Sequence, residues 1–398
     1  MKNNAKNSFL LVALISTLLA LGVFGYLSTH YYELKFGAPT EGSMCNINDV
    51  MNCDAVAASS FSALFGIPMA LWGLATNLVL LYFLLVTRFN LVQDKEKASR
   101  YTLMLSGITL IASIVMGLIS TQMANLCIFC ITSYVLSLIT FICVLLGAYE
   151  VSVSNLMNDF KDIFVTERWV LGFAIAIPVI AFLGNIMFLE SHGYSKIAKI
   201  SEEKIAYWNV ATVQTFDPAA GLILQKGTGE PVMTIVEFAD FRCPHCKHAA
   251  PGLHAFTKSR PDVRLQFKPF PLDGTCNQAI QGGDGISCGI AAAVMCAEQQ
   301  SKKGWETHDF FFDTQETVLR TPNLDQNLQA ASEKLGLNLD ELKKCVQDPA
   351  MQESIRKMAK EGATAQIRGT PTIFVNNKLL EGGHLVPVLE AAYQSLKK

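Results

Sequence analysis

Five long apolar runs occupy the first half of the chain and constrain its fold more than any other feature. They cover residues 9–27, 65–86, 103–123, 126–149 and 169–189. Each run has close to the roughly 20 apolar residues that an α-helix needs to cross a bilayer. Backbone groups in lipid must be hydrogen-bonded within the protein, so such runs fold as helices. The sequence therefore predicts a membrane half with five spanning helices.

The first run follows Lys2 and Lys6 and is also compatible with a cleaved signal peptide. No small-x-small cleavage site follows it, and the run is long for a signal core. We therefore expect a retained helix.

Basic residues between the runs predict the orientation of the helices. Alternate connections carry the positive charges. Lys2 and Lys6 precede the first run, Arg88, Lys95, Lys97 and Arg100 lie between the second and third runs, and Lys161 and Arg168 lie between the fourth and fifth. The other connections hold only Lys35. The positive-inside rule then places the N-terminus in the cytoplasm. Loop 28–64, the start of the fourth run and everything after Leu189 fall on the outer side.

Composition separates the membrane half from residues 191–398, which look soluble. Charged residues are only 17% of the 398-residue chain, against about 25% in soluble proteins. The net charge of −2 argues against a nucleic-acid partner. Eleven cysteines are many for a cytosolic protein and favour an oxidising compartment for at least part of the chain.

Two cysteine pairs are predicted at the outer surface of the membrane half. Cys127 and Cys130 open the fourth run, where their spacing puts both on one helix face and the helix start favours a thiolate. Cys45 and Cys53 lie in loop 28–64. Taken alone, the loop pair fits a stabilising disulfide as well as a redox role. Beside a second pair at the same surface, it favours electron relay by thiol–disulfide exchange.

This half resembles the vitamin K epoxide reductase family. The resemblance covers roughly residues 8–147. It rests on Cys45 and Cys53 with their spacing, Ser59, Phe65-Gly66-Ile67-Pro68 at the start of a run, Cys127-x-x-Cys130, and Tyr134. The resemblance implies a four-helix bundle that holds a quinone beside the CxxC pair.

The same resemblance implies an electron path. Electrons would enter at Cys45, pass from Cys53 to Cys127, and leave from Cys130, which would lie nearest the quinone. Two positions match family residues that hydrogen-bond the quinone ring: Ser59 and Tyr134.

Three other interpretations concern polar or reactive residues of these runs. Tyr134 shares the helix face of Cys130 by its spacing, although a tyrosine of the membrane interface fits the same pattern. Asn77 within the second run has either a functional or a packing role. Cys143 is expected to be an inert buried thiol.

The outer half contains another CxxC pair at a predicted strand–helix junction. An apolar strand over residues 232–238 leads into Cys243-Pro244-His245-Cys246 and a helix to about Ser259. Pro244 fits the first helical turn, and both the helix start and His245 favour a thiolate at Cys243. Residues 191–229, before this strand, are predicted to form a polar tether with some helix around residues 202–208.

A zinc site is the competing interpretation of the Cys243–Cys246 pair. It needs two further ligands, for which His248 and His254 are the candidates. The order strand–CxxC–helix is typical of redox domains and favours the redox interpretation.

Residues 231–398 resemble the DsbA-type thioredoxin-fold oxidases. Besides the CPHC motif, the resemblance rests on Gly369-Thr370-Pro371-Thr372 before a strand at 373–376, where that family has a cis-proline. It also rests on a helical insertion over about 286–367 that follows a strand at 263–270. The resemblance implies that Cys243 attacks and Cys246 resolves. Three residues are expected to contact an extended substrate segment: His245, Thr370 and Pro371.

The four remaining cysteines of the outer half lack CxxC spacing, so we interpret them as structural. They are Cys276, Cys288, Cys296 and Cys345. Four cysteines allow three connectivities, and nearness in sequence favours 276 with 288 and 296 with 345. A buried free thiol is the alternative for Cys296.

Together these features predict a membrane all-α four-helix bundle plus a fifth transmembrane helix, followed by a soluble α/β thioredoxin-like domain with a helical insertion. The expected domains are a quinone-reductase domain at 1–150, a segment at 151–230, and a DsbA-like domain at 231–398. The middle segment holds a cytoplasmic loop, the fifth helix at about 169–189 and the tether. No metal is expected.

The predicted function is a disulfide-forming thiol:quinone oxidoreductase of the bacterial cytoplasmic membrane, with its thioredoxin-like domain outside. The expected substrates are reduced secreted or periplasmic proteins, and the expected electron acceptor is ubiquinone or menaquinone.

A reductive thiol transporter is an alternative that needs cysteines within reach of the cytoplasm, where only the unpaired Cys143 is a candidate. A non-redox chaperone or binding protein would tolerate loss of Cys127 or Cys130. Reduction of vitamin K epoxide is chemically close, but the fused client-binding domain favours protein thiols as the electron source.

Overall fold

The computed structural model of the protein describes residues 2–37, 45–46, 50–123, 125–148, 151–191, 195–320 and 322–397. The chain forms two compact units. One consists of Met1–Glu33 with Ser43–Tyr194, and the other of Leu34–Gly42 with Ser195–Lys398.

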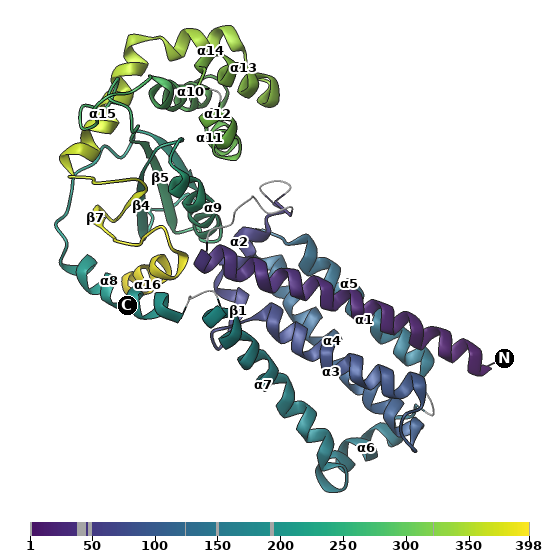
Figure 1. Ribbon diagram of the computed structural model, residues 1–398. Coiled ribbons are helices and arrows are strands. Elements are labelled where there is room, and N and C mark those ends of the chain that lie inside the picture. Colours follow the sequence, from purple (N-terminus) through teal and green to yellow (C-terminus); the bar gives the residue numbers. More distant parts are fainter. Residues whose placement is uncertain are drawn as a thin grey trace. The chain divides into compact units, whose positions relative to one another are not determined.

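The first unit is a bundle of long apolar helices. α1 (Lys2–Tyr32) packs along α3 (Met69–Phe89) and α5 (Ile128–Gly147), and α4 (Lys95–Gln122) packs against the same two helices (Figure 1). α7 (Arg168–Ser191) lies against α3. These are the five helices of the described chain that are long and apolar enough to cross a membrane. The predicted membrane bundle with a fifth helix is confirmed.

The interior of the bundle is apolar where its four helices meet. Leu10 and Ala13 of α1 pack with Leu80 and Leu84 of α3 and with Val144 of α5. α1 thus contributes side chains to the core of the bundle, as a retained helix is expected to do.

Short elements complete this unit. They are α2 (Cys53–Ala58), a 3-10 turn (Ser60–Ser62), β1 (Ala63–Leu64), β2 (Ile67–Pro68) and α6 (Val153–Val165). A π-helical turn, Glu33–Gly37, follows α1 where the chain passes from the first unit into the second.

The second spanning helix starts later than the predicted residue 65. β1 and β2 form a small hairpin, and α3 begins only at Met69. Phe65 and Gly66 at the hairpin tip have φ angles of 54° and 76°. Left-handed backbone reverses the chain and cannot continue a right-handed helix. The apolar run of the sequence therefore includes the hairpin as well as the helix.

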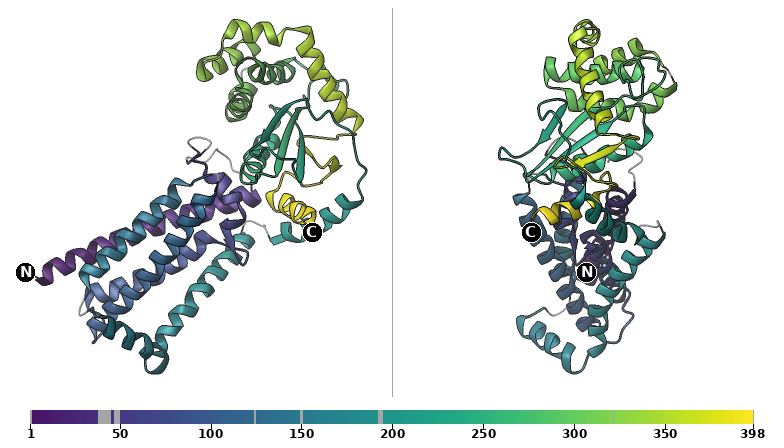
Figure 2. Two further views of the ribbon diagram at one scale, coloured as in Figure 1. Left: turned by 180° about the vertical axis from the view of Figure 1, so that it is seen from behind. Right: turned by 90° about the vertical axis from the view of Figure 1, so that its left-hand side faces the viewer.

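The second unit is built on a mixed five-stranded sheet (Figures 1 and 2). Its strands are β3 (Leu222–Gln225), β4 (Met233–Ala239), β5 (Val263–Pro269), β6 (Thr372–Val375) and β7 (Lys378–Leu379), in the order β3-β5-β4-β6-β7. β4 and β5 are parallel and are connected by α9 (Pro244–Lys258), and the other pairs are antiparallel. The predicted thioredoxin-like fold is confirmed.

Alternate residues of the central strand β4 face two separate cores. Met233 and Ile235 pack with α9 and with the C-terminal helix α16 (Val386–Leu396), whereas Val236 and Phe238 face an aromatic cluster with Phe374 of β6. A strand buried on both faces has a continuous apolar sequence, which is why this strand is recognisable from sequence.

Six helices are inserted between β5 and β6, in the region predicted for the helical insertion. They are α10 (Ile286–Ser301), α11 (Gly304–Asp313), α12 (Gln315–Arg320), α13 (Leu324–Leu335), α14 (Leu339–Val346) and α15 (Pro349–Thr364). α10 is the central one, since all residues from Ile286 to Ala297 are buried.

The segment 191–229 is more structured than the predicted tether, so the tether interpretation needs correction. α8 (Ser195–Val210) packs against α16, and the Trp208 indole donates a hydrogen bond to the Val375 carbonyl at 3.1 Å. β3 pairs with β5. Gly221 (φ 96°) permits this pairing, because a Cβ there would lie 2.1 Å from the Phe267 carbonyl oxygen. The sheet of the second unit therefore begins before residue 231.

Candidate active site

The loop between α1 and α3 is fastened to the segment that precedes α5. The Asn52 N–H donates to the Leu126 carbonyl at 2.9 Å, and the Leu126 N–H donates to the Val50 carbonyl at 2.7 Å. Asn52 also caps α2 by accepting a 2.8 Å hydrogen bond from the Ala55 N–H. These bonds hold Cys53, the first residue of α2, beside Cys127, the residue before α5.

The sulfur atoms at this junction are arranged for exchange. Cys45 and Cys53 form a disulfide, whereas Cys127 and Cys130 are free thiols. Cys127 Sγ lies 3.1 Å from Cys53 Sγ. Exchange proceeds by contact of a thiolate with a disulfide sulfur, so one sulfur of each pair stands where a Cys53–Cys127 bond can form.

Cys127 is placed to act as a thiolate at the start of α5. Its Sγ caps the helix by accepting a 3.3 Å hydrogen bond from the Cys130 N–H. A hydrogen bond from the Cys130 side chain lowers the pKa of Cys127, and the N–H groups of Cys130 and Phe129 and the charge of His30 act in the same direction. A lowered pKa raises the share of the reactive thiolate at neutral pH.

A cavity of about 230 Å³ adjoins these sulfurs inside the bundle. Cys53, Cys127 and Cys130 lie on its wall together with Ser59 and Tyr134. The rest of the wall is mostly apolar and comes largely from α1, α3 and α4; it includes Phe24, Leu27, Trp72, Ile108, Ala112 and Met116.

Several polar side chains interrupt this apolar wall, among them Tyr134, Ser59 and Asn77. The Tyr134 hydroxyl lies 3.3 Å from Ser120 Oγ, and the Ser59 hydroxyl donates to the Val56 carbonyl at 2.7 Å. Asn77 donates its amide N–H to the Gly73 carbonyl at 2.9 Å. The structure thus brings the two predicted quinone contacts to one wall, together with Asn77, whose role the sequence leaves open.

His30 and Asp54 belong to the same site, although no sequence motif marks them. His30 Nε2 and Asp54 Oδ1 form a 2.8 Å ion pair between side chains that are each 8% exposed. Asp54 also accepts a 2.7 Å hydrogen bond from the Asn46 amide. Since Asp54 follows Cys53 and Asn46 follows Cys45, these contacts tie the loop disulfide to α1. The available signal was a histidine near the end of an apolar run and an acid next to a cysteine, and nothing in their spacing pairs them.

Cys143 is a free thiol buried in the core of the bundle with Leu80 and Leu84. This burial fits the inert thiol expected at this position.

In the second unit, Cys243 stands between β4 and α9, with Pro244 in the first helical turn. A hydrogen bond from the Cys246 side chain is the main cause that lowers the pKa of Cys243 to about 5, and Thr370 and the backbone N–H groups of Cys246 and His245 act in the same direction. Burial raises the pKa of the Cys246 thiol. The reduced pair therefore has one reactive thiolate and one protonated partner at neutral pH.

The loop before β6 adjoins the thiol of Cys243. The Thr370–Pro371 peptide bond is cis, as the resemblance implied. Cys243 Sγ lies 3.3 Å from the Thr370 carbonyl oxygen. His245, Thr370 and Pro371 line one surface hollow. The structure thus brings the predicted substrate contacts to the side of Cys243.

The structure groups His254 with residues other than Cys243. Its Nδ1 lies 3.5 Å from Asp309 Oδ1, and its ring packs against His308. Within the described ranges, the clusters of three potential metal ligands contain neither Cys243 nor Cys246. This arrangement gives the zinc interpretation no support.

Glu237 is a fully buried carboxyl group on β4. Neither of its oxygens has a hydrogen-bond partner among the described residues. Burial raises its pKa to about 8, so the group is protonated at neutral pH.

Two disulfides lie in the part of the chain between β5 and β6. Cys276 is bonded to Cys288 and Cys296 to Cys345, each with a Cα–Cα distance of 6.0 Å. This is the pairing that nearness in sequence favours, and Cys296 is not a free thiol.

Residues 11–145 match the model of the Vitamin K epoxide reductase family, and residues 234–394 match the model of the DSBA-like thioredoxin domain. A "Probable disulfide bond formation protein D" of Bacillus anthracis is 24% identical over 219 residues, which are 52% of this chain and 88% of that protein. A "Na(+)/H(+) antiporter NhaA 3" of Salinispora tropica is 28% identical over 170 residues, which are 43% of this chain and 24% of that protein. The chain thus spans about a quarter of the antiporter relative. The crystal structure of oxidised BdbD from Bacillus subtilis has a TM-score of 0.38 at 19% identity and covers 47% of this chain and 99% of its own.

The bundle of five long apolar helices, the thioredoxin-like sheet and the paired cysteines together have the fold and the side chains that thiol–disulfide exchange requires. Residues 11–145 form a vitamin K epoxide reductase family domain and residues 234–394 form a DSBA-like thioredoxin domain, joined in one polypeptide.

Proposed function

We propose that this chain forms disulfide bonds in reduced secreted or periplasmic proteins and passes the electrons to a quinone, either ubiquinone or menaquinone. The observation that carries the proposal is the 3.1 Å contact between Cys53 and Cys127 at the wall of the apolar cavity. The contact joins a site of thiol–disulfide exchange to a site suited to a lipid-soluble electron acceptor.

The first step is oxidation of a client protein by the Cys243–Cys246 disulfide. A client thiolate attacks Cys243 Sγ, and the electron pair of the disulfide goes to Cys246. A second client thiolate then attacks the client sulfur, and Cys243 leaves as a thiolate. Its pKa of about 5 makes it a good leaving group. His245, Thr370 and Pro371 are placed to contact the client segment.

The second step passes the electrons to the bundle. The reduced Cys243–Cys246 pair reduces the Cys45–Cys53 disulfide by attack at Cys45. Because both modules are in one chain, each is present at a high effective concentration near the other. The step requires the loop cysteines and the second unit to be on one side of the membrane, which the charges between the helices predict to be the outer side.

The third step moves the electrons into the helix pair. The Cys53 thiolate attacks Cys127 Sγ of a Cys127–Cys130 disulfide, and the electron pair of that bond goes to Cys130. Cys45 then attacks Cys53, which closes the loop disulfide and leaves the electron pair on Cys127. A closed loop disulfide beside two free thiols, as found in the bundle, is the product of this step.

The cavity suits a quinone as the final acceptor. Its apolar wall would hold the ring and its tail, the hydroxyls of Ser59 and Tyr134 and the amide of Asn77 would bind ring oxygens, and Cys130 lies on the wall. When bound, a quinone supplies an acceptor for two electrons and two protons.

Quinone absorbance tests the proposal. The purified full chain is mixed with a reduced, unfolded client protein and a soluble quinone, and loss of the quinone signal is followed together with client thiols. We expect one quinone to be reduced for each client disulfide formed, with no reduction by a Cys130→Ser variant. Cys143→Ser, which changes the buried thiol of the bundle core, is the matched control and should keep the rate. No loss of quinone signal, or a full rate in Cys130→Ser, would contradict the proposal.

A further inference from the structure

The ion pair of His30 and Asp54 supplies no exchanging sulfur, yet it is buried at the centre of that site. The two residues are only 6% and 5% exposed. Removing two charges from water costs several kcal/mol per ion, and pairing repays this cost only when the geometry is very good. A stabilising role is therefore a poor explanation for this pair, and its position beside reacting sulfurs points to chemistry.

Both members of the pair are close to reacting groups. Asp54 is covalently adjacent to Cys53, and His30 lines the same cavity as Cys127 and Cys130. The imidazole stacks on Tyr26 with ring centroids 5.8 Å apart, and Tyr26 in turn packs against Phe129 of α5. These contacts hold the imidazole on the side of α1 that faces the start of α5.

The proposed exchange requires movement of protons as well as electrons. Each loop thiol must lose its proton before it attacks, so two protons leave Cys45 and Cys53 while two electrons arrive at Cys127 and Cys130. The acceptor takes up both electrons and two protons. Because the site is buried, the protons need ionisable groups that connect the loop with the cavity.

We propose that His30 and Asp54 accept the protons released by the loop thiols and deliver them to the cavity, parallel to the path of the electrons through the sulfurs. This proposal rests on the proposed function. The other titratable groups around the pair are Tyr26 and Tyr31 on α1, Cys53 on α2, and Cys127, Cys130 and Tyr134 at the start of α5. Helices α3 and α4 add no titratable side chain to the described cavity wall.

The test measures the internal exchange step without quinone. In the full chain, the loop pair is reduced by a pulse of small dithiol while Cys127–Cys130 is oxidised, and rapid alkylation at set times counts thiols on each pair. We expect His30→Gln and Asp54→Asn to slow the transfer by about 100-fold, the low end of general acid–base effects. We also expect both variants to lose the pH dependence and the solvent deuterium isotope effect of the wild type.

Asn46→Ala provides the matched control, because it removes the hydrogen bonds of Asn46 to Asp54 but keeps the ion pair. It should slow the transfer only slightly and keep the pH dependence and the isotope effect. The proposal is overturned if His30→Gln transfers electrons at the wild-type rate, or if it is slow but keeps both signatures, since the pair would then act only by positioning the loop. A wild-type chain in which Cys127–Cys130 never becomes reduced would instead contradict the proposed function.

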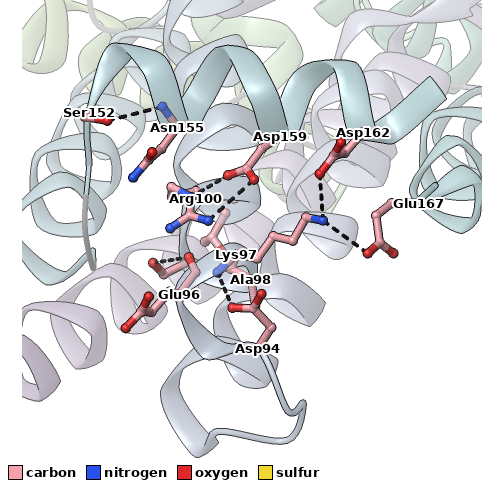
Figure 3. Close-up of polar contacts among 12 residues, drawn as sticks. Asp94, Glu96, Lys97, Ala98, Arg100, Ser152, Asn155, Asp159, Asp162 and Glu167 are labelled. Atoms are coloured by element: carbon pink, nitrogen blue, oxygen red, sulfur yellow. Dashed lines mark hydrogen bonds and ion pairs between the residues drawn. The ribbon is translucent and has the colours of Figure 1, made fainter. Parts of the chain in front are cut away.

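A separate observation concerns the amphipathic helix α6, which connects the two spanning helices α5 and α7. Its polar side is clamped to the start of α4 (Figure 3). Asp159 forms an ion pair with Arg100, and Lys97 reaches both Asp162 at 3.0 Å and Glu167 at 3.2 Å. The clamp fixes which side of α6 faces the bundle.

The opposite side of α6 is apolar and uncovered within the described chain. Its large side chains are more than half exposed: Met157, Phe160, Phe164 and Val165. The helix also stands at the membrane surface, since it joins the ends of two spanning helices. We infer that this face lies in the bilayer interface, with its aromatic rings at the boundary between headgroups and acyl chains.

Quenching by brominated lipid tests this placement in the reconstituted full chain. Phe160→Trp adds a fluorophore to the apolar face, and Asn158→Trp adds one to an exposed polar position of the same helix. In phosphatidylcholine brominated near the headgroup, Phe160→Trp should lose most of its added fluorescence, and Asn158→Trp should lose little. Equal quenching of the two variants, or no quenching of either, would overturn the inference.

Discussion

The two CxxC motifs of this chain share a local design and differ in what surrounds them. Cys127 and Cys243 each occupy the N-cap position of a helix, α5 and α9, and each is favoured as a thiolate there. Cys127 faces a second cysteine pair of its own chain across 3.1 Å. Cys243 faces a surface loop with a cis-proline. The helix start thus supplies reactivity in both places, and the tertiary surroundings decide which partner the reactive sulfur meets.

The largest expected effect is loss of quinone reduction, and the electron donor distinguishes the two CxxC motifs. Cys127→Ser should abolish quinone reduction with any electron donor, because it removes the sulfur of the helix pair that contacts Cys53 at 3.1 Å. Cys243→Ser should abolish it with a protein client but leave it intact with a small dithiol that reduces Cys45–Cys53 directly. Quinone absorbance with the two donors measures both. Loss of the small-dithiol reaction in Cys243→Ser would show that the two motifs do not act in series.

The second unit also depends on disulfides outside its redox motif. The double variant Cys296→Ser, Cys345→Ser opens a loop with a sequence separation of 49 residues. The chain-entropy model gives a loss of about 4 kcal/mol for such a loop and about 3 kcal/mol for the shorter Cys276–Cys288 loop. Hydrogen exchange of α10 amides in the full chain reports the opening free energy. A larger effect from the shorter loop would contradict the entropic explanation.

Glu237 should make the stability of the second unit depend on pH. Its pKa is about 8 in the folded chain and about 4.3 when unfolded. Between these two pH values the folded state keeps a proton on Glu237 that the unfolded state has lost. The free energy of unfolding is therefore highest below pH 4 and falls as the pH rises towards 8. Glu237→Gln removes this loss, which we estimate as on the order of 3 kcal/mol at pH 7.

Hydrogen exchange of β4 amides in the oxidised full chain at pH 4 and pH 7 measures this difference. The variant and the wild type should be equally stable at the lower pH. A constant difference at both pH values would mean that ionisation of Glu237 is not the cause.

The acidity of Cys243 predicts a smaller but distinctive kinetic effect. With its pKa near 5 rather than 9, the thiolate share at pH 7 is about 100-fold higher than for an unperturbed thiol. Alkylation of the reduced chain should therefore show a midpoint near pH 5. For the same reason, the reduced second unit should gain stability over pH 5–9 as the thiolate forms. A midpoint near pH 9 would remove the distinction between Cys243 and an ordinary thiol.

The smallest expected effect concerns the quinone cavity. Tyr134→Phe removes one hydroxyl from its wall and should raise the KM for quinone several-fold, since a hydrogen bond contributes about 1 kcal/mol. Thr132→Val changes an exposed residue of the same helix and serves as the control. An unchanged KM in Tyr134→Phe would exclude Tyr134 as a quinone contact.

Much of this protein follows from local patterns in its sequence. The spanning helices are set by unbroken apolar length, because lipid leaves the backbone no other hydrogen-bond partners. The strand β4 and the start of α9 follow from an apolar run, a cysteine at the N-cap position and a proline in the first helical turn, all within a dozen positions of one another. Local sequence is sufficient in these places because the determining interactions are between near neighbours.

Only the tertiary structure decided which distant groups meet. The contact of Cys53 with Cys127 depends on a backbone bridge between Asn52 and Leu126, and the ion pair of His30 with Asp54 depends on how α1 packs beside α2. β3 joins the sheet because Gly221 allows its backbone to approach Phe267 closely. The polar sequence around β3 gives no sign of this approach. Such contacts arise when separate elements pack together, so no spacing along the chain encodes them, and in this protein they are where the proposed electron and proton paths run.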